Sequence, residues 1–283
     1  MPDEKPLPPV PPDVTDDAVL GGRLRLLQPR RGHRFGHDAI LLAAATRARS
    51  GERIADLGAG VGTAGLAVAA RVPGVHVKLV EISAGLATLA ALNAARNQLV
   101  DRVNAVALDI GASAADFAAA GLPPASCDAV LMNPPFNDPA RHKASPDRRR
   151  RTAHDLGGPA TLVTWVDAAA RLLRRGGALT TIFRADGLID LLGALTASFG
   201  AITVLPVHGK PGGSAVRVIV GAVKGSGAPP AVLPGLVLAD DDGTPSDAAD
   251  AVLRGGADLA LFTSPPPHAN GNGNGGDTTM GTP

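Results

Sequence analysis

Short β-branched and apolar runs alternate with Ala- and Leu-rich stretches through most of this chain of 283 residues. We expect strands at Arg53–Leu57, His76–Glu81, Val103–Leu108, Ala129–Met132, Ala178–Phe183, Ala201–Leu205 and Val216–Val223. The expected helices are His37–Arg49, Thr63–Arg71, Ser83–Asn97, Ala112–Ala119, Ala160–Arg174, Gly187–Ser198 and Pro245–Arg254. This alternation predicts an α/β fold with an open, mainly parallel sheet covered by helices on both faces. Ligands of such sheets bind beyond the carboxyl ends of the strands.

The two ends of the chain differ from this pattern. Residues 1–18 hold six prolines and little apolar content, and residues 264–283 are rich in Gly, Asn and Pro. We expect both ends to be disordered, which leaves a single domain at 19–263. The N-terminus lacks the apolar core of a signal peptide, and no uncharged apolar stretch approaches the ~20 residues that a membrane span needs. These features predict a soluble, cytoplasmic protein; they are compatible with a monomer but do not specify the oligomeric state.

Composition limits the chemistry. Apolar residues make up 45% of the chain but aromatic residues only 2%, so the core has to be built from Ala, Val and Leu. The net charge is +1, so any nucleic-acid surface has to be a local patch. Cys127 is the single cysteine and stands beside an apolar run, which predicts a buried, inert thiol. The seven histidines show no metal-ligand spacing, and we expect no metal site.

A glycine-rich loop follows the strand Arg53–Leu57. The segment Asp56-Leu57-Gly58-Ala59-Gly60-Val61-Gly62-Thr63 lets the backbone approach a ligand without interference from Cβ atoms. Gly60, Gly62 and Gly65 also spell G-x-G-x-x-G, with acidic Glu81 about twenty residues beyond, which is the pattern of a dinucleotide site. By itself the loop is therefore compatible with a nicotinamide- or flavin-dependent oxidoreductase.

Acidic residues around the loop favour a cationic nucleoside. Asp56 stands just before the glycines, where a carboxylate repels pyrophosphate and attracts an ammonium or sulfonium group. Glu81 ends the next strand and can accept both hydroxyls of a ribose. Asp109 ends the strand after that and can accept from an adenine amino group, although capping of the following helix would explain it too. Three carboxylates around a glycine loop thus predict S-adenosylmethionine in preference to NAD.

Asn133-Pro134-Pro135-Phe136 follows the apolar run that ends at Met132. The Asn133 side chain and the Pro134 carbonyl can each accept a hydrogen bond from an exocyclic –NH₂, and Phe136 can stack on the ring that carries it. A simpler interpretation is that the prolines end a strand and that Phe136 packs into the core. The glycine loop and the carboxylates upstream favour a platform for a flat, amino-bearing group.

Four segments of this chain resemble, in order and spacing, the motifs of class I S-adenosylmethionine-dependent methyltransferases. They are D-L-G-A-G-V-G, V-E-I-S, A-L-D-I and N-P-P-F. An N-P-P-[FY] motif in that family implies transfer to adenine N6, guanine N2 or a glutamine amide. The segments Gln28–Ala43, Arg217–Val220 and Asp247–Gly255, and the basic stretch after Asn133-Pro-Pro-Phe-Asn-Asp-Pro, are similar to the bacterial tRNA1(Val) adenine-37 N6-methyltransferases. The resemblance covers about residues 20–262.

The resemblance implies a Rossmann-like fold with a seven-stranded sheet and direct methyl transfer without a covalent enzyme intermediate. It implies a catalytic platform made of Asn133, Pro134, Pro135 and Phe136. The implied cofactor contacts are Asp38, Asp56, Gly58, Gly60, Gly62, Glu81, Ile82, Asp109, Ile110 and Asn133. Asp38 also stands at the start of a helix, so a capping role is equally compatible. Phe136 and Asn137 stand where many members of the family carry tyrosines, which leaves the target identity open.

Two basic clusters predict an RNA partner. The first follows the platform and sets six positive charges against one acid, Asp147; its members are Arg141, Lys143, Arg148, Arg149, Arg150 and Arg151. The second precedes the glycine loop and contains Arg30, Arg31, His33 and Arg34, with Phe35 available for stacking. A solvated loop would explain the charges too, but their position beside Asn133-Pro-Pro-Phe favours contacts to phosphates.

The leading prediction is therefore an RNA adenine-N6 methyltransferase, with tRNA as its substrate. Within the same class, the alternatives are a guanine-N2 methyltransferase of ribosomal RNA and a protein glutamine-N5 methyltransferase. Outside it, an NAD(P)-dependent oxidoreductase and a binding module without activity remain to be distinguished.

Overall fold

The computed structural model describes residues 13–31, 36–135 and 159–262. The expected disordered tail lies outside the described residues, as do the first twelve residues of the chain. The predicted substrate and platform residues that also lie outside are Arg34, Phe35, Phe136, Arg141, Lys143, Arg148, Arg149, Arg150 and Arg151. The structure therefore neither confirms nor corrects the roles expected of these nine residues, and those roles stay predictions.

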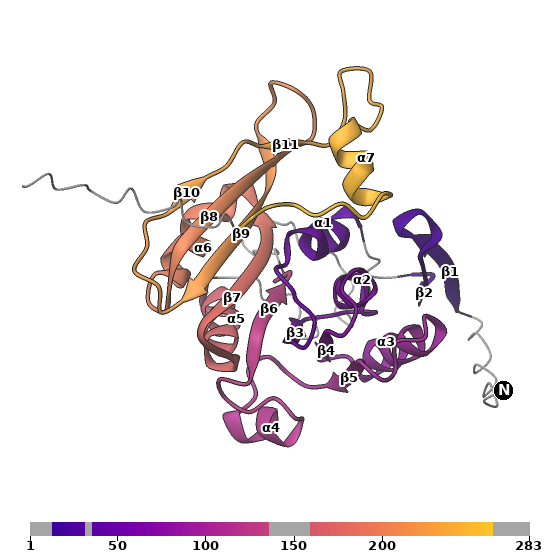
Figure 1. Cartoon of the computed structure of the whole chain (residues 1–283), viewed down its shortest axis with the longest axis vertical. Coiled ribbons are helices and arrows are strands. Elements are labelled where there is room, and N and C mark those ends of the chain that lie inside the picture. The colour runs from indigo at the N-terminus through magenta and orange to yellow at the C-terminus, as the bar shows by residue number, and fades with distance from the viewer. Residues whose placement is uncertain (1–12, 32–35, 136–158, 263–283) are drawn as a thin grey trace, which may run out of the picture.

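A nine-stranded sheet forms the centre of the fold, in the order β10-β8-β9-β7-β6-β3-β4-β5 with β11 also paired to β8 (Figure 1). Its strands are β3 (Arg53–Leu57), β4 (His76–Glu81), β5 (Val103–Ala107), β6 (Cys127–Met132), β7 (Leu173–Arg184), β8 (Phe199–His208), β9 (Ala215–Lys224), β10 (Ala231–Val232) and β11 (Leu236–Val237). Strands β3 to β7 are parallel to one another, and β9 lies antiparallel between β7 and β8. The predicted Rossmann-like α/β sheet is confirmed. Strands β10 and β11 are additional to the seven expected, because two-residue strands carry no alternation that a sequence pattern could reveal.

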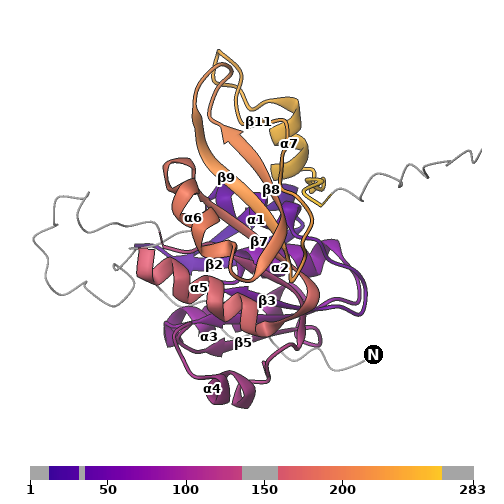
Figure 2. The ribbon, with the colours of Figure 1, turned by 90° about the vertical axis from the view of Figure 1, so that its left-hand side faces the viewer.

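Helices cover both faces of this sheet, as expected (Figures 1 and 2). One face carries α1 (His37–Ala45), α2 (Thr63–Arg71), α3 (Ala84–Arg96) and α7 (Asp247–Leu253), and the other α4 (Ala114–Ala119), α5 (Pro159–Leu172) and α6 (Leu188–Leu195). Successive strand residues alternate between the two cores: Leu79 and Leu131 belong to the first, Val80 and Met132 to the second. Among the described helices, none has the length and apolarity that crossing a membrane would require.

Several element boundaries coincide with the expected ones. Strands β3 and β4 and helix α2 begin and end where the sequence predicts them. Helix α1 ends at Ala45, before the predicted end at Arg49, because Thr46 takes an extended conformation and its hydroxyl donates to the Leu42 carbonyl at 2.7 Å. Strand β7 begins at Leu173, before the predicted Ala178, directly after α5.

A two-stranded hairpin precedes the sheet and corrects the expected disorder of residues 1–18. Strand β1 (Val14–Val19) pairs antiparallel with β2 (Leu24–Pro29), and Asp16 lies opposite Leu27. The prediction was wrong from Val14 onward. The two buried residues of β1, Val14 and Val19, are separated by a polar, acidic run, so the sequence shows no apolar alternation that would indicate a strand. Figure 1 shows the hairpin beside α3, on the side of the molecule away from β10 and α6.

Candidate active site

The strand register brings the predicted cofactor residues to one edge of the sheet. Leu57 of β3 lies opposite both Val80 of β4 and Met132 of β6. Each of these residues is followed by a predicted site segment: the glycine loop, Glu81 and Asn133. Chain order reverses between β3 and β6, since β4 and β5 lie to one side of β3 and β6 and β7 to the other. Ligands of open α/β sheets bind at such a switch point.

The glycine loop is held in place by β4. The N–H groups of Gly58 and Ala59 both donate to the Val80 carbonyl, at 2.8 and 2.9 Å. Gly58, Gly60 and Gly62 have φ values of 71, 57 and 88°, in the left-handed region that glycine adopts without strain. A Cβ at Gly58 would overlap the Trp165 ring, whereas a Cβ at Gly60 would meet nothing within 4 Å. The loop thus packs tightly at Gly58 and borders open space at Gly60.

Asp56 lies beneath this loop. The residue is 2% exposed, and Oδ2 accepts the backbone N–H of Gly65 at 2.8 Å. Burial raises the pKa of Asp56 to about 7; the hydrogen bond from Gly65 opposes this rise, and the negative charge of Glu81 adds to it. A cation bound above the loop would favour the ionised form. Asp56 is therefore held against the start of α2, and it would act on a ligand above the loop through its electric field.

Glu81, at the end of β4, is hydrogen-bonded to the same loop. It is 4% exposed, with Oε2 accepting from Gly60 N and Oε1 from Ser83 N, both at 2.9 Å. Carboxylate oxygens can each accept more than one hydrogen bond. The geometry places this carboxylate directly beside the open space at Gly60, where ribose hydroxyls would need an acceptor. Ile82, the next residue, is half-buried.

Asp109 follows β5 on an exposed turn. Its Oδ1 accepts the N–H of Gly111 at 2.8 Å. Capping of the next helix does not explain it, because Ser113 caps α4 and exchanges hydrogen bonds with Asp116. Ile110 is buried in the core on the α4 and α5 face. Asp109 therefore keeps an exposed carboxylate one strand away from Glu81.

Asn133 carries an unsatisfied acceptor. Its Oδ1 is buried and has no hydrogen-bond partner within the described residues. Pro134 is buried and Pro135 half-buried, so the segment leaves β6 as a rigid ledge. A buried acceptor without a partner costs about 1–3 kcal/mol, a cost that a donor on a ligand would remove.

Asp38 pairs with Arg217, which sequence analysis included only in the segment Arg217–Val220 and to which it gave no role at the site. Its Oδ2 accepts from Arg217 Nε at 2.9 Å, which ties α1 to the start of β9. The capping hypothesis for Asp38 is wrong, because the N-cap of α1 is Gly36 and makes no side-chain hydrogen bond. No local pattern predicts the pairing of Arg217 with Asp38, since the contact joins segments far apart in the chain.

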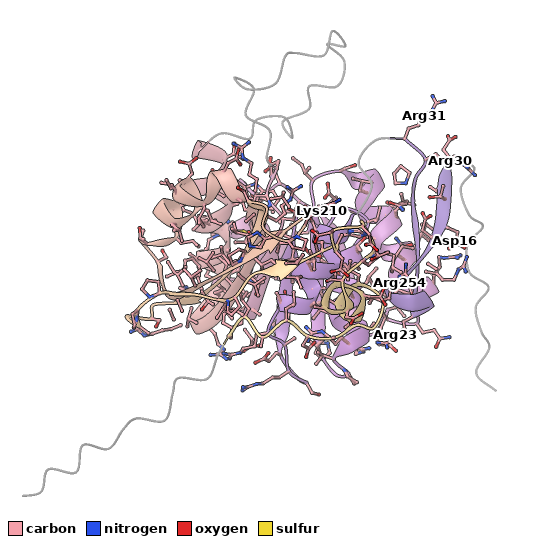
Figure 3. The ribbon with its side chains drawn as sticks, turned by 90° about the horizontal axis from the view of Figure 1, so that it is seen from above. Asp16, Arg23, Arg30, Arg31, Lys210 and Arg254 are labelled. Atoms are coloured by element: carbon pink, nitrogen blue, oxygen red, sulfur yellow. The ribbon has the colours of Figure 1, made fainter. Side chains whose placement is uncertain are left out.

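Other predicted residues lie as follows. Arg30 and Arg31 are exposed at the end of β2, and Figure 3 shows them together there. Cys127 is buried, as expected, and burial raises the pKa of its thiol. Trp165 is buried in the core, and its ring lies against Gly58. Among the described residues no His, Cys, Asp and Glu side chains group as a metal site would need.

The basic cluster that follows the platform in the sequence contains six of the predicted RNA contacts. Arg148, Arg149, Arg150 and Arg151 lie outside the described residues, together with Arg141 and Lys143. Of the predicted RNA contacts, the structure therefore brings only Arg30 and Arg31 into view.

Comparisons with known proteins agree with this geometry. Residues 35–210 match a family model described as methyltransferase small domain. The tRNA1(Val) (adenine(37)-N6)-methyltransferase of Enterobacter sp. (strain 638) is 34% identical over 146 residues, which are 51% of this chain and 56% of that protein. The release factor glutamine methyltransferase of Chlorobaculum tepidum is 31% identical over 163 residues, which are 56% of this chain and 54% of that protein. This chain thus spans about half the length of these two relatives.

A solved structure matches more of the chain. The crystal structure of a predicted O-methyltransferase from Agrobacterium tumefaciens has a TM-score of 0.66 and 30% identity, and the match covers 78% of this chain and 98% of that one. The names of these three proteins give three different acceptors, a nucleobase nitrogen, a protein amide and an oxygen. Similarity alone therefore leaves the acceptor to be argued from the site.

Proposed function

Because this chain belongs to the methyltransferase small domain family, we propose that it is an N-methyltransferase that modifies the exocyclic N6 amine of adenine in RNA, with tRNA as the substrate. The family also decides between the two interpretations of the glycine loop, in favour of S-adenosylmethionine over NAD. The proposal for the acceptor rests on one observation above all, the buried and unpartnered Oδ1 of Asn133 among the described residues.

The residues at the sheet edge fit S-adenosylmethionine, which supplies an electrophilic methyl group on a sulfonium. Glu81 would accept the ribose hydroxyls, and Asp109 the adenine amino group. Gly60 leaves room for close approach, since a Cβ there would meet nothing within 4 Å. The buried charge of Asp56 would be stabilised by a cation above the loop, where a pyrophosphate would be repelled.

Asn133 and Pro134 would position the acceptor amine. The amine of adenine is a weak nucleophile because its lone pair is delocalised into the ring. Hydrogen bonds from the –NH₂ to Asn133 Oδ1 and to the Pro134 carbonyl favour a pyramidal nitrogen and orient its lone pair. Positioning and electrostatics of this kind can lower a barrier by several kcal/mol. No base is required before transfer, since the nitrogen becomes acidic once methylated.

Charge supports RNA as the partner. Arg30 and Arg31 stand exposed at the end of β2. In the sequence, six further cations come directly after the platform: Arg141, Lys143, Arg148, Arg149, Arg150 and Arg151. Phosphates are the natural ligands of such clusters. The tRNA-modifying relative supports the same class of substrate.

The accessibility of the target base fits the same proposal. A base in an anticodon loop is already close to accessible and needs little energy to leave its stack, whereas a base inside a stem has to be flipped out. We place the enzyme in the cytoplasm, where tRNA is found.

A protein glutamine amide is the second candidate, supported by the similarity to a release factor glutamine methyltransferase. Like an adenine amine, an amide –NH₂ is planar and would satisfy Asn133. It would leave the basic residues without a role.

The test incubates the full chain with labelled S-adenosylmethionine and either total bacterial tRNA or purified release factors. We expect label in tRNA, recovered as N6-methyladenine by mass spectrometry of the nucleosides. Label recovered as N2-methylguanine, or only in release factor, would replace the adenine assignment. Calorimetry with S-adenosylhomocysteine and with NADH provides the cofactor control, and binding of NADH alone would overturn the methyltransferase assignment.

A further inference from the structure

Two asparagine side chains of α3 and its C-cap complete the hydrogen bonding of strand β2. Asn93 Oδ1 accepts from Leu27 N at 2.7 Å, and its Nδ2 donates to Leu27 O at 2.9 Å. One turn later Asn97 makes the same pair of bonds to the backbone of Arg25, both at 2.9 Å. A helix advances ~6 Å over four residues and a strand ~6.8 Å over two, so the spacings match. The two amides occupy the place of a third strand beside the hairpin.

Asn93 makes one further bond, and it reaches the glycine loop. Its Nδ2 also donates to the Val61 carbonyl at 3.0 Å. Asn93 is 0% exposed, so these bonds are shielded from water and competition. Val61 lies between Gly60, whose N–H is held by Glu81, and Gly62, which precedes α2. Both donors of one amide therefore join the hairpin to the predicted cofactor loop.

The C-terminal end of β2 leads directly into two of the predicted RNA contacts. The strand ends at Pro29 and is followed by exposed Arg30 and Arg31. Figure 3 shows these two arginines at one end of the hairpin, with Arg23 at the opposite end. The hairpin is further fixed to α3 by the ion pair between Asp16 and Arg96, at 2.6 Å. A shift of the loop at Val61 would therefore be transmitted through Asn93 to the strand that carries Arg30 and Arg31.

We infer that Asn93 is a positioning residue through which cofactor binding and RNA binding favour each other. A nucleoside bound at Gly60 and Glu81 would restrict the movement of the Val61 carbonyl. Because Asn93 bonds to this carbonyl and to Leu27, the position of β2 would be restricted with it. By thermodynamic linkage, RNA bound at Arg30 and Arg31 raises the affinity for the cofactor by the same factor by which the cofactor raises the affinity for RNA, typically ~5–150-fold. The inference rests on the proposed function, because it takes the glycine loop as the cofactor site and the arginines as RNA contacts.

The first test uses the unmodified chain and amide hydrogen exchange, with and without saturating S-adenosylhomocysteine. We expect slower exchange in the glycine loop and also in residues 24–29, which the ligand would not touch. Protection confined to the glycine loop and Glu81 would overturn the inference and leave the proposed function intact. Absence of protection at the glycine loop would overturn both.

The second test compares Asn93→Ala with Asn97→Ala, which loses hairpin bonds without losing a bond to the loop. Affinity for total bacterial tRNA is measured with and without S-adenosylhomocysteine. In the unmodified chain we expect the nucleoside to tighten tRNA binding by ~5-fold or more. Asn97→Ala should weaken tRNA binding but keep the ratio of the tRNA affinities with and without the nucleoside. Asn93→Ala should bring this ratio close to one and should also weaken binding of the nucleoside.

An unchanged ratio in Asn93→Ala, or an equal loss of the ratio in both variants, would show a merely structural role and overturn the inference. Should Asn93→Ala not fold, the exchange experiment decides alone. Failure of the unmodified chain to bind tRNA at any salt concentration would instead overturn the RNA assignment and the inference together.

Discussion

Asp56 and Gly65 are joined by a buried hydrogen bond of 2.8 Å from the Gly65 N–H to Asp56 Oδ2. A Cβ at Gly65 would overlap Leu79 Cδ2 and lie 3.0 Å from this carboxylate oxygen. The third glycine of the G-x-G-x-x-G pattern is thus required for the packing of α2 on β4. The dinucleotide-like spacing has a structural cause here that is independent of any phosphate.

The raised pKa of Asp56 predicts a pH-dependent stability. Between 3.8 and about 7 the native state holds a proton that the unfolded chain has lost. Stability from this group is therefore fully present in acid and is lost as pH rises, by ~1.4 kcal/mol per unit within that window. Asp56→Asn keeps an acceptor for Gly65 and carries no charge, so this part of the slope should vanish. Urea unfolding across the window measures it; identical slopes in both proteins would contradict the burial of an ionisable Asp56.

Gly58 and Gly60 form a matched pair, since both have positive φ but only at Gly58 would an added Cβ meet a side chain. We expect Gly60→Ala to lower the free energy of unfolding only by the ~1–2 kcal/mol that a left-handed alanine costs. Its methyl group would occupy space needed by the ligand and should weaken binding of S-adenosylhomocysteine by about tenfold or more. Gly58→Ala should destabilise the fold more, because overpacking against Trp165 adds ~1–3 kcal/mol.

Thermal unfolding and calorimetry on these two variants separate the effects. Unimpaired nucleoside binding by Gly60→Ala would mean that the ligand does not pass over this glycine.

Charge reversal at the end of β2 tests the RNA surface. Replacing Arg30 and Arg31 by Glu should weaken tRNA binding and reduce the slope of log affinity against log salt by ~1–2, as expected for the loss of one or two phosphate contacts. Arg23→Glu is the control, because Arg23 is exposed at the opposite end of the hairpin. Filter binding over a salt series measures both. Equal losses for the two changes would indicate a general effect of charge.

Much of the fold could be predicted because its signals are local. Strands β3 and β4 and helix α2 are bounded by glycines, prolines or charges that lie within a few residues of their ends. The strand ends then place Glu81 and Asn133 together without further information, since the strands are parallel. The family motifs mark the same edge of the sheet.

The contacts that sequence analysis missed are non-local. Strand β1 looks like part of an acidic, Pro-rich terminus, and the other strand of its hairpin, β2, is held by Asn93 and Asn97, more than sixty residues away. Two asparagines four residues apart in an Ala-rich helix were the available signal, because asparagine is a poor helix former unless its amide has partners. Arg217 gives no such signal, and its pairing with Asp38 emerges only from the sheet order.

Asn133→Ala tests the positioning of the acceptor amine most directly. Because the buried Oδ1 of Asn133 is proposed to contact the acceptor amine, the variant should bind S-adenosylhomocysteine within a few-fold of the unmodified chain. Single-turnover methylation of total tRNA should fall by at least ~10²-fold, the loss typical for removing one preorganised partner of the reacting group. Methylation at the unmodified rate would contradict the central claim.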